Sequence, residues 1–177
     1  SSYAQSNSEC MILNSEGMYG YFKSTDYSLS CVMLAGDNQA MERDYWYSST
    51  RKYENLESPS EIGEKASSRA ISRLNAKTIS SRVCPIIFPA EVATSFFNNF
   101  LSAINGHAIY KKSSFLLDKL GSEIFPEFIT IREDPSIVEG MGTRPFDSDG
   151  VLTEKKNIIN RGILETYLLD TYSARKL

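Results

Sequence analysis

Residues 82–106, RVCPIIFPAEVATSFFNNFLSAING, divide the chain into two parts and decide how the rest is organised. The apolar run Val83–Phe88 predicts a buried strand. Pro85 within it favours an edge position or a bulge, because proline cannot donate a ladder hydrogen bond. Pro89 predicts the start of a long amphipathic helix, and Gly106 predicts its C-terminal cap.

The predicted helix has an apolar stripe and an opposite polar face. The stripe consists of Val92, Phe96, Phe97, Phe100 and Ile104, and the polar face carries Asn98, Ser102 and Asn105. Burying the three Phe rings would stabilise this part of the chain by roughly 5–8 kcal/mol before entropy costs.

The chain before this stretch predicts an antiparallel meander. Runs of strand-forming residues are joined by turns that are too short for parallel crossovers. The predicted strands are Ser8–Leu13, Met18–Thr25, Tyr27–Ala35 and Gln39–Tyr47, with turns at Asn14–Gly17 and Gly36–Asn38. In the last strand, Tyr45-Trp46-Tyr47 is better explained by packing on a covered sheet face than by a ligand platform.

A helix is expected after the meander. Ser58 predicts its N-cap, Pro59 its first helical position, and Glu61 completes a capping box. The helix should run to about Asn75 and bury one stripe against the meander. That stripe is Ile62, Ala66, Ala70 and Leu74.

The polar stretch Ala76–Arg82 is the candidate domain boundary, which predicts an α/β sandwich over residues 1–78 and a second domain over residues 79–177. After Gly106 the sequence predicts an extended segment, a short helical turn, a strand and a hairpin around Arg161-Gly162. In order, these are Ala108–Lys112, Ser113–Leu120, Ile124–Glu133, and the pair Leu152–Asn160 and Ile163–Asp170. The fold class is therefore α+β, an antiparallel β-meander packed with a helix and followed by a second strand-rich unit opened by a strand and a helix.

The composition is that of an ordinary globular protein, with 41% hydrophobic and 23% charged residues. A net charge of −3 and scattered basic pairs argue against direct nucleic-acid binding. No apolar run approaches the ~18–20 residues that span a bilayer, and the polar start lacks the regions of a signal peptide. The missing initiator Met and the abrupt end at Leu177 suggest a fragment of a longer chain.

Three cysteines without paired spacing favour free buried thiols in a reducing compartment, so the cytoplasm is expected. They are Cys10, Cys31 and Cys84. Cys10 and Cys31 could meet across neighbouring strands, but two small apolar strand residues are the favoured interpretation.

Few residues are candidates for chemistry. His107 is the only histidine, and the sequence places no nucleophile beside it, so contacts with free carbonyls at a helix end are favoured over catalysis. One histidine and three unclustered cysteines do not supply a zinc site. Asp147–Gly150 resembles part of a calcium loop, but the twelfth position is Ile158 instead of glutamate, which favours a simple turn. Gly140 and Gly142 lack the rest of a phosphate-binding signature.

Several stretches, in their order and spacing, carry a family resemblance. The most distinctive are Phe146–Val151 (FDSDGV) and Gly162–Arg175 (GILETYLLDTYSAR). The others are Cys31–Gly36, Met41–Tyr47, Leu56–Pro59 and Tyr110–Leu116. Together they resemble the TldD/PmbA family, and specifically its PmbA (TldE) branch, from about Glu9 to Leu177.

The resemblance implies a two-subunit zinc metallopeptidase of the bacterial and archaeal cytoplasm, associated with peptide-antibiotic maturation, antitoxin degradation and control of DNA gyrase. The TldD branch carries a His-Glu-x-x-x-His motif on a helix, and the PmbA branch is a partner that lacks it. The corresponding stretch is Asn98–Ala103, where Asn98 and Asn99 neither bind zinc well nor act as a general base.

We therefore expect a PmbA/TldE-like non-catalytic subunit, with no catalytic, cofactor-binding or metal-binding residue in this chain and with zinc in a TldD-like partner. Its other expected partner is an unfolded or peptide substrate, held in extended form by exposed strand edges. Direct contacts with nucleic acid or with a membrane are not expected. The alternative is a regulatory protein-binding module of the gyrase-modulator type without a role in proteolysis.

Overall fold

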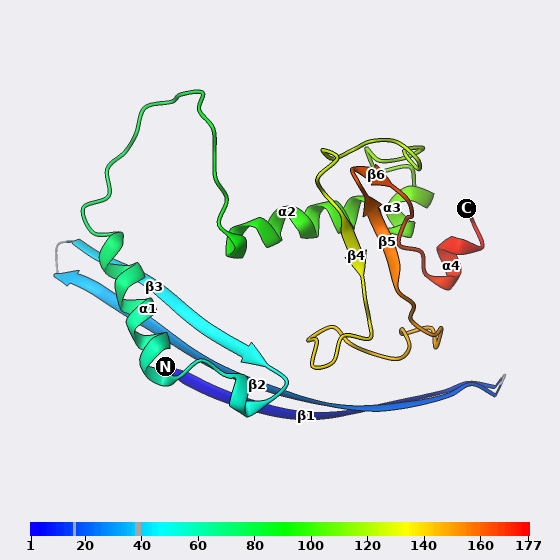
Figure 1. The fold of residues 1–177 in the computed structure, drawn as a ribbon, viewed down its shortest axis with the longest axis horizontal. Coiled ribbons are helices and arrows are strands. Elements are labelled where there is room, and N and C mark those ends of the chain that lie inside the picture. Colours follow the sequence, from blue (N-terminus) through cyan, green and yellow to red (C-terminus); the bar gives the residue numbers. More distant parts are fainter. Residues whose placement is uncertain (16, 38–39) are drawn as a thin grey trace. The chain divides into compact units, whose positions relative to one another are not determined.

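The structure, a computed structural model, describes residues 1–15, 17–37 and 40–177. The chain forms two compact units (Figure 1). Unit 1 comprises Ser1–Arg82 and Ile137–Arg144, and unit 2 comprises Val83–Ser136 and Pro145–Leu177. Each unit combines helices with an antiparallel sheet, which confirms the predicted α+β class.

Unit 1 is built on a three-stranded sheet of β1 (Ser2–Leu13), β2 (Tyr19–Asp37) and β3 (Ala40–Thr50), paired in the order β1-β2-β3. The predicted antiparallel meander is confirmed, but the described residues form three strands where four were predicted. The two predicted strands on either side of Asp26 are one continuous strand, β2. Glu16, Asn38 and Gln39, which belong to predicted turns and a predicted strand start, lie outside the described residues.

The chain continues in extended conformation through Asp26 because of contacts with Arg51, which lies 25 residues later in the sequence. Thr25 and Asp26 stay in register with β1, opposite Asn7 and Ser6. Arg51 donates to Asp26 Oδ1 at 2.8 Å and to the carbonyl of Thr25 at 3.3 Å, while Thr25 Oγ1 donates to the Arg51 carbonyl at 2.7 Å. These bonds hold residues with turn-like side chains in extended conformation.

Helix α1 (Pro59–Ser72) covers one face of this sheet, after a single 3-10 turn, η1 (Tyr53–Asn55). The predicted capping box is present: Ser58 Oγ accepts from Glu61 N at 3.3 Å, and the Glu61 carboxylate accepts from Ser58 N at 2.9 Å. Ile62, Ala66 and Ala70 are buried as predicted, but Leu74 lies beyond the end of the helix and is only partly buried. The helix ends at Ser72, slightly before Asn75.

Polar contacts also join α1 to β3. Asp44 is buried in the sheet and accepts from Arg69 Nε at 3.2 Å and Arg73 Nη1 at 3.4 Å. The backbone N–H of Tyr45, followed by Arg69 and Arg73, lowers the pKa of Asp44 despite its burial. Trp46 lies on the same face beneath Lys65 and Arg69, whereas its neighbours Tyr45 and Tyr47 point to the uncovered face.

The predicted strand Val83–Phe88 is wrong. This segment is irregular, and its apolar side chains are exposed: Val83 fully and Ile87 to 92%. Among the described residues no strand pairs with it, and Pro85 lacks one of the donors that pairing would need. An isolated run of strand-forming residues has no partner backbone to stabilise it.

Helix α2 (Ala90–Ala103) begins after Pro89 as predicted, but its apolar stripe is buried only at the C-terminal end. Phe100 and Ile104 are buried, whereas Phe96 and Phe97 are 53% and 41% exposed. The expected burial of three Phe rings is therefore wrong for this chain. The apolar residues of α2 do have helical spacing. Among the described residues, however, no helix or strand of unit 2 covers the first turns of α2.

Gly106 does not cap α2. It is the first residue of a second helix, α3 (Gly106–Tyr110), whose N-cap Asn105 accepts from His107 N at 3.0 Å. The extended segment predicted at Ala108–Lys112 is consequently wrong. Asn105 caps the start of a new helix at the point where Gly106 was expected to end the previous one. The helical turn predicted at Ser113–Leu120 consists of hydrogen-bonded turns that place Leu116 in the core.

The second sheet contains β4 (Ile131–Glu133), β5 (Lys156–Asn160) and β6 (Ile163–Leu164) in the order β4-β5-β6. The predicted hairpin around Arg161-Gly162 is confirmed, with φ of 47° and 82° at the two turn residues. Its strands are shorter than predicted, and β4 is only the end of the predicted strand Ile124–Glu133. The core of unit 2 comprises Phe100, Ala103, Ile104, Leu116, Ile158, Ile159 and Leu164. A short helix, α4 (Thr171–Ala174), follows.

Candidate functional site

The polar face of α2 is the position at which the family resemblance implies a metal-binding motif in catalytic relatives. Asn99 Nδ2 donates to the Ser95 carbonyl at 3.0 Å, and Ser102 Oγ donates to the Asn98 carbonyl at 2.9 Å. Both side chains are therefore bonded to the backbone of their own helix. A zinc ion needs three or four converging imidazole, thiolate or carboxylate ligands. Asn98, Asn99 and Ser102 are none of these, so the residues at the position of the motif do not fit the metal.

The same conclusion holds beyond α2. In residues 1–15, 17–37 and 40–177, no group of three or more His, Cys, Asp or Glu side chains is placed to hold a metal ion. The absence of catalytic and metal residues in the whole chain stays a prediction.

His107 lies beside Asp170, which is 63 positions later in the sequence. The distance between His107 Nε2 and Asp170 Oδ2 is 3.0 Å, and the imidazole stacks on Tyr172 with 5.8 Å between ring centroids. Asp170 also accepts from Ser173 N at 2.7 Å, which caps α4. The Ser173 hydroxyl and N–H, with a smaller effect from His107, lower the pKa of Asp170. The pair joins α3 to α4.

No pattern in the sequence predicts this pair. The expected contact of His107 with free helix carbonyls is wrong for its ring, which meets a carboxylate. Asp170-Thr171-Tyr172-Ser173 does carry the signal of an N-cap, since aspartate followed by a donor-bearing residue at the third helical position is a common helix start. That signal locates α4 but not the histidine that packs on it.

The Asp147–Gly150 segment is a turn, as predicted. Asp147 Oδ1 accepts from the backbone N–H groups of Asp149 and Val151, both at 2.9 Å, and Asp149 Oδ2 accepts from Thr171 N at 2.9 Å. The Thr171 N–H and hydroxyl lower the pKa of Asp149. These oxygens organise backbone, which is the ordinary use of aspartate in turns.

The cysteines are free thiols, and the register of the paired strands keeps Cys10 and Cys31 from lying opposite each other. Cys10 lies opposite Phe22, and Cys31 lies opposite Trp46. Both are partly buried, but Cys84 is exposed, so the expectation of a buried thiol is wrong there.

The loop that contains Gly140 and Gly142 is bonded to the protein itself, because the carbonyls of Gly140 and Met141 accept from Arg51.

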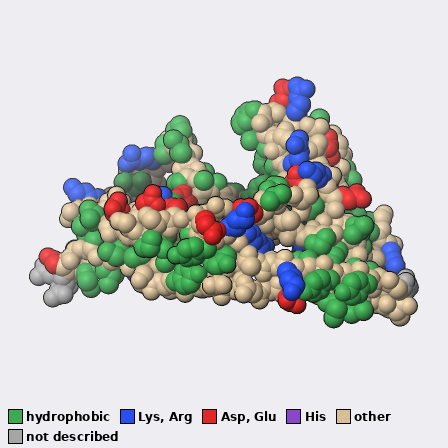
Figure 2. Space-filling view, turned by 60° about the horizontal axis from the view of Figure 1, so that its bottom comes forward, with side chains coloured by type: hydrophobic (Ala, Val, Ile, Leu, Met, Phe, Trp, Pro, Cys, Tyr) green, Lys and Arg blue, Asp and Glu red, His purple; other side chains and the backbone are tan. Residues whose placement is uncertain are grey.

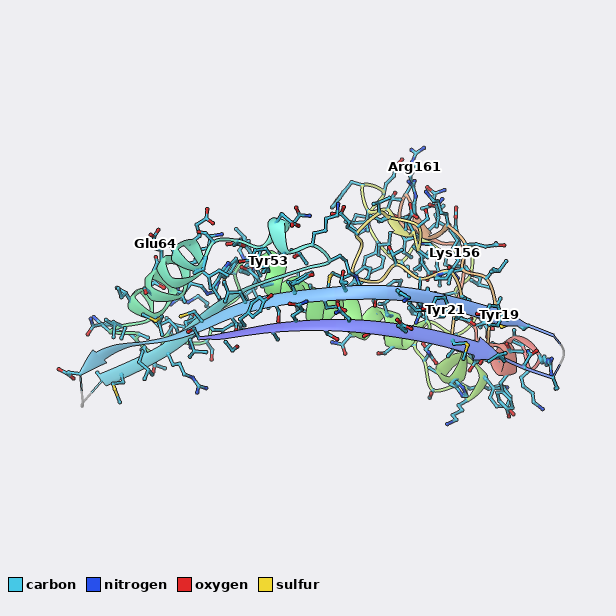
Figure 3. All side chains as sticks on the ribbon, turned by 90° about the horizontal axis from the view of Figure 1, so that it is seen from below. Tyr19, Tyr21, Tyr53, Glu64, Lys156 and Arg161 are labelled. Carbon is cyan, nitrogen blue, oxygen red and sulfur yellow. The ribbon has the colours of Figure 1, made fainter. Side chains whose placement is uncertain are left out.

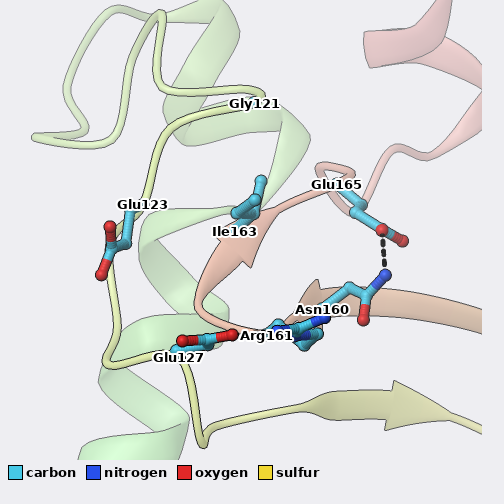
Figure 4. A pocket seen from close by; sticks show the side chains of 7 residues that line it. All are labelled: Gly121, Glu123, Glu127, Asn160, Arg161, Ile163 and Glu165. Carbon is cyan, nitrogen blue, oxygen red and sulfur yellow. Dashed lines mark hydrogen bonds and ion pairs between the residues drawn. The ribbon is translucent and has the colours of Figure 1, made fainter.

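A small polar depression lies beside the final hairpin of unit 2, lined by three glutamates together with Asn160 and Arg161 (Figure 4). Arg161 pairs with Glu127, and Asn160 Nδ2 donates to Glu165 Oε1 at 2.7 Å. The third glutamate is Glu123. Surface pairs of this kind are common in folded proteins.

The free edge of β1 is the feature best suited to bind a partner. In the sheet order β1-β2-β3, no described strand pairs with the outer edge of β1, which extends over Ser2–Leu13. This edge lacks proline and has a single charged residue, Glu9, so it has few of the usual devices that block strand addition.

Apolar side chains accompany this edge toward the hairpin end of β1 and β2. Tyr19 and Tyr21 lie there, at the other end of the ribbon from Glu64 of α1 (Figure 3). They pair with Leu13 and Met11. All four are exposed, between 42% and 65%. An extended peptide added to β1 would therefore find backbone donors and acceptors beside apolar side chains.

Two further observations concern other kinds of partner. On the face drawn in Figure 2, Lys and Arg side chains are scattered among hydrophobic and acidic ones. A gathered basic surface is the usual footprint of nucleic-acid binding. In the described part of the chain, no helix has the length and apolarity to cross a membrane.

Two protein-family models match the chain. Residues 1–74 match the central domain of the PmbA/TldA metallopeptidases, and residues 81–177 match their C-terminal domain. The helix-covered sheet and the α2-led second unit thus correspond to two consecutive domains of a family described as PmbA/TldA metallopeptidases. More particularly, this chain belongs to the PmbA/TldD family.

Individual relatives agree with this. The chain is 46% identical to the Metalloprotease PmbA homolog of Buchnera aphidicola over 93% of its own length and 37% of that protein. It is also similar to a crystal structure from Bacteroides thetaiotaomicron, described as a candidate modulator of DNA gyrase. That match has a TM-score of 0.92 and 34% identity, covering 98% of this chain and 40% of the other.

A third relative supports the fold alone. The crystal structure of TldE from Thermococcus kodakarensis matches with a TM-score of 0.74 at 22% identity, covering 98% of this chain and 39% of that chain. The chain thus spans less than two-fifths of the Buchnera protein and about two-fifths of these solved chains.

Proposed function

We propose that the chain is the middle part of a PmbA/TldE-like subunit that lacks catalytic residues and works with a TldD-like zinc metallopeptidase partner. The observation that supports this proposal is the polar face of α2, where the amide of Asn99 and the hydroxyl of Ser102 bond to their own helix and no histidine is present. The domain limits 1–78 and 79–177, the two-subunit assembly and a cytoplasmic location belong to the same proposal.

Within such an assembly, the subunit holds an unfolded or peptide substrate in extended form. The free edge of β1 and the exposed apolar side chains beside it support this role. Strand addition draws affinity from backbone hydrogen bonds, so it accepts many sequences. That tolerance suits proteolysis and peptide maturation, in which substrates differ in sequence.

The assembly is tested with the full-length protein and its catalytic partner. We expect the two to co-purify, peptide cleavage to require both, and zinc to be found with the partner only. Cleavage by the partner alone at the same rate would remove the proposed role. Stoichiometric zinc in the purified full-length subunit would show instead that it is a metallopeptidase in its own right.

The binding edge is tested with two neighbouring proline substitutions, Ser6→Pro and Asn7→Pro, in β1. Backbone N–H groups of successive strand residues point to opposite edges. One substitution therefore removes a bond to β2, and the other removes only an outward N–H. The variant that keeps the wild-type fold by circular dichroism should bind peptide at least fivefold more weakly. Unchanged peptide affinity in that variant would exclude the β1 edge.

A second candidate function is a regulatory binding module that acts on a protein such as DNA gyrase without proteolysis. The description of the Bacteroides relative favours it. The two functions differ in one measurement, because a regulatory module changes gyrase supercoiling activity and leaves peptide cleavage by the partner unaffected.

A further inference from the structure

The segment Ile137–Arg144, which we call the strap, belongs by its contacts to unit 1, although its flanking residues belong to unit 2. The chain leaves unit 2 after Ser136 and returns to it at Pro145. We propose that the strap is a releasable conformational device, held on unit 1 by polar contacts that open while both units stay folded.

The main anchor is Arg51, which follows β3. Its side chain is only 17% exposed and is already fixed by Asp26 and the Thr25 carbonyl. From this position its guanidinium donates to two strap carbonyls, Gly140 at 3.5 Å and Met141. A planar guanidinium with five donors can serve both sets of acceptors at once.

Glu139 makes the second attachment. Its carboxylate pairs with Lys52 Nζ and accepts from Asn55 Nδ2 at 2.9 Å. Lys52 is the main cause that lowers the pKa of Glu139. The backbone of Glu139 has a φ of 64°, in the left-handed region that glutamate rarely adopts. The strained conformation therefore persists with the help of these side-chain contacts.

The strap is closed within itself as well. Thr143 Oγ1 donates to the Ile137 carbonyl at 2.6 Å, and Gly140 N donates to the same carbonyl at 3.0 Å. A Cβ at Gly140 would lie 2.7 Å from Thr143 Oγ1, so this compact turn needs glycine there. Undocking would leave this short turn without its anchors, so the exchange of Gly140 N and Thr143 N reports on it.

Apolar burial contributes little to holding the strap. Ile137, Val138 and Met141 are 56%, 85% and 48% exposed. The Lys52–Glu139 pair is also partly exposed, with side chains 58% and 31% accessible. Exposed ion pairs are weak and are screened by salt. Docking by such contacts is reversible, unlike the burial of α1 on its sheet.

Hydrogen-exchange mass spectrometry of the full-length protein tests the proposal. We expect amides of residues 138–144 to exchange at least threefold faster at 500 mM than at 50 mM NaCl, while amides of α1 are unchanged. Arg51→Ala should accelerate exchange in the strap at least tenfold at low salt, and Glu139→Gln should accelerate it to a smaller extent. Arg43→Ala, an exposed arginine on β3, is the matched control and should leave the strap unaffected.

Two outcomes would overturn the proposal. One is strap exchange within twofold of wild type in both Arg51→Ala and Glu139→Gln. The other is exchange that accelerates together in the strap and in β2, β3 and α1, which would show that the strap opens only when unit 1 unfolds. Should Arg51→Ala disturb unit 1 by itself, Glu139→Gln decides, because that substitution alters only the strap side of the contact.

Discussion

Gly106, the first residue of α3, lies directly against Ser173 of α4: a Cβ built on Gly106 would be 2.1 Å from Ser173 Oγ and 2.7 Å from Ser173 Cβ. Both residues are buried, and Gly106 N donates to the Leu168 carbonyl at 2.7 Å. Glycine is therefore required at this position by the approach of another element, because its φ is not in the left-handed region.

We expect Gly106→Ala to destabilise unit 2 by about 1–3 kcal/mol, since the added methyl group overpacks a closed contact. Denaturant unfolding followed by hydrogen exchange of amides in each unit measures it. Gly63→Ala on α1 is the matched control, because no atom lies within 4 Å of its Cβ position. That variant should gain roughly 0.5–1 kcal/mol, the helix preference of alanine over glycine. Equal effects of the two substitutions would contradict the packing argument.

Ser58→Ala should destabilise unit 1 by about 1 kcal/mol, since it removes the N-cap acceptor of α1 and half of its capping box. Ser68→Ala, at an exposed position inside the same helix, serves as its control and should change stability by less than about 0.5 kcal/mol. The free energy of unfolding from urea titration is the measurement. A loss as large for Ser68→Ala as for Ser58→Ala would mean that capping is not the cause.

Phe100 and Phe96 lie one turn apart on α2 but differ in burial, at 8% and 53% exposure. Phe100 also packs edge-on against Phe125, with ring centroids 5.2 Å apart. Phe100→Ala should cost about 3–5 kcal/mol, as for a buried aromatic ring, whereas Phe96→Ala should cost less than half of that in this chain. Thermal and denaturant unfolding of both variants checks the difference. A similar loss for both would show that the first turns of α2 are covered in solution.

Asp134 makes unit 2 sensitive to acid. Lys155, together with Ser136, lowers the pKa of this carboxyl from 3.8 to about 2. Because the folded pKa lies below the unfolded one, the contribution to stability is complete above about pH 4 and is lost as the pH falls toward 2. Asp134→Asn and Lys155→Gln should each flatten the stability profile between pH 4 and 2. Urea midpoints measured across that range test this, and an unchanged slope in both variants would refute it.

Local signals predicted several elements correctly. Ser58, Pro59 and Glu61 define the start of α1 through contacts within four residues, and Arg161-Gly162 defines a hairpin because both residues adopt positive φ. The starting point of α2 follows in the same way from Pro89. Such signals depend on neighbours in the chain, so the sequence contains all the information they need.

Predictions failed where a distant residue decided the outcome. Val83–Phe88 has the composition of a strand, but no described strand pairs with it, and a strand has no stability of its own. Thr25 and Asp26 have turn-like side chains, but Arg51 holds them extended. The joining of His107 to Asp170 depends on how α3 meets α4, which no local pattern encodes.

The family, the α+β class, the capped helix over a meander and the absence of histidine from α2 could all be predicted from the sequence, because each follows from residue identity and short-range spacing. Three features became visible only in the folded chain: which half of the α2 stripe is buried, why position 106 needs glycine, and that the strap folds onto unit 1. Burial and contact between distant segments depend on which surfaces meet in space, and residue spacing along the chain does not specify that.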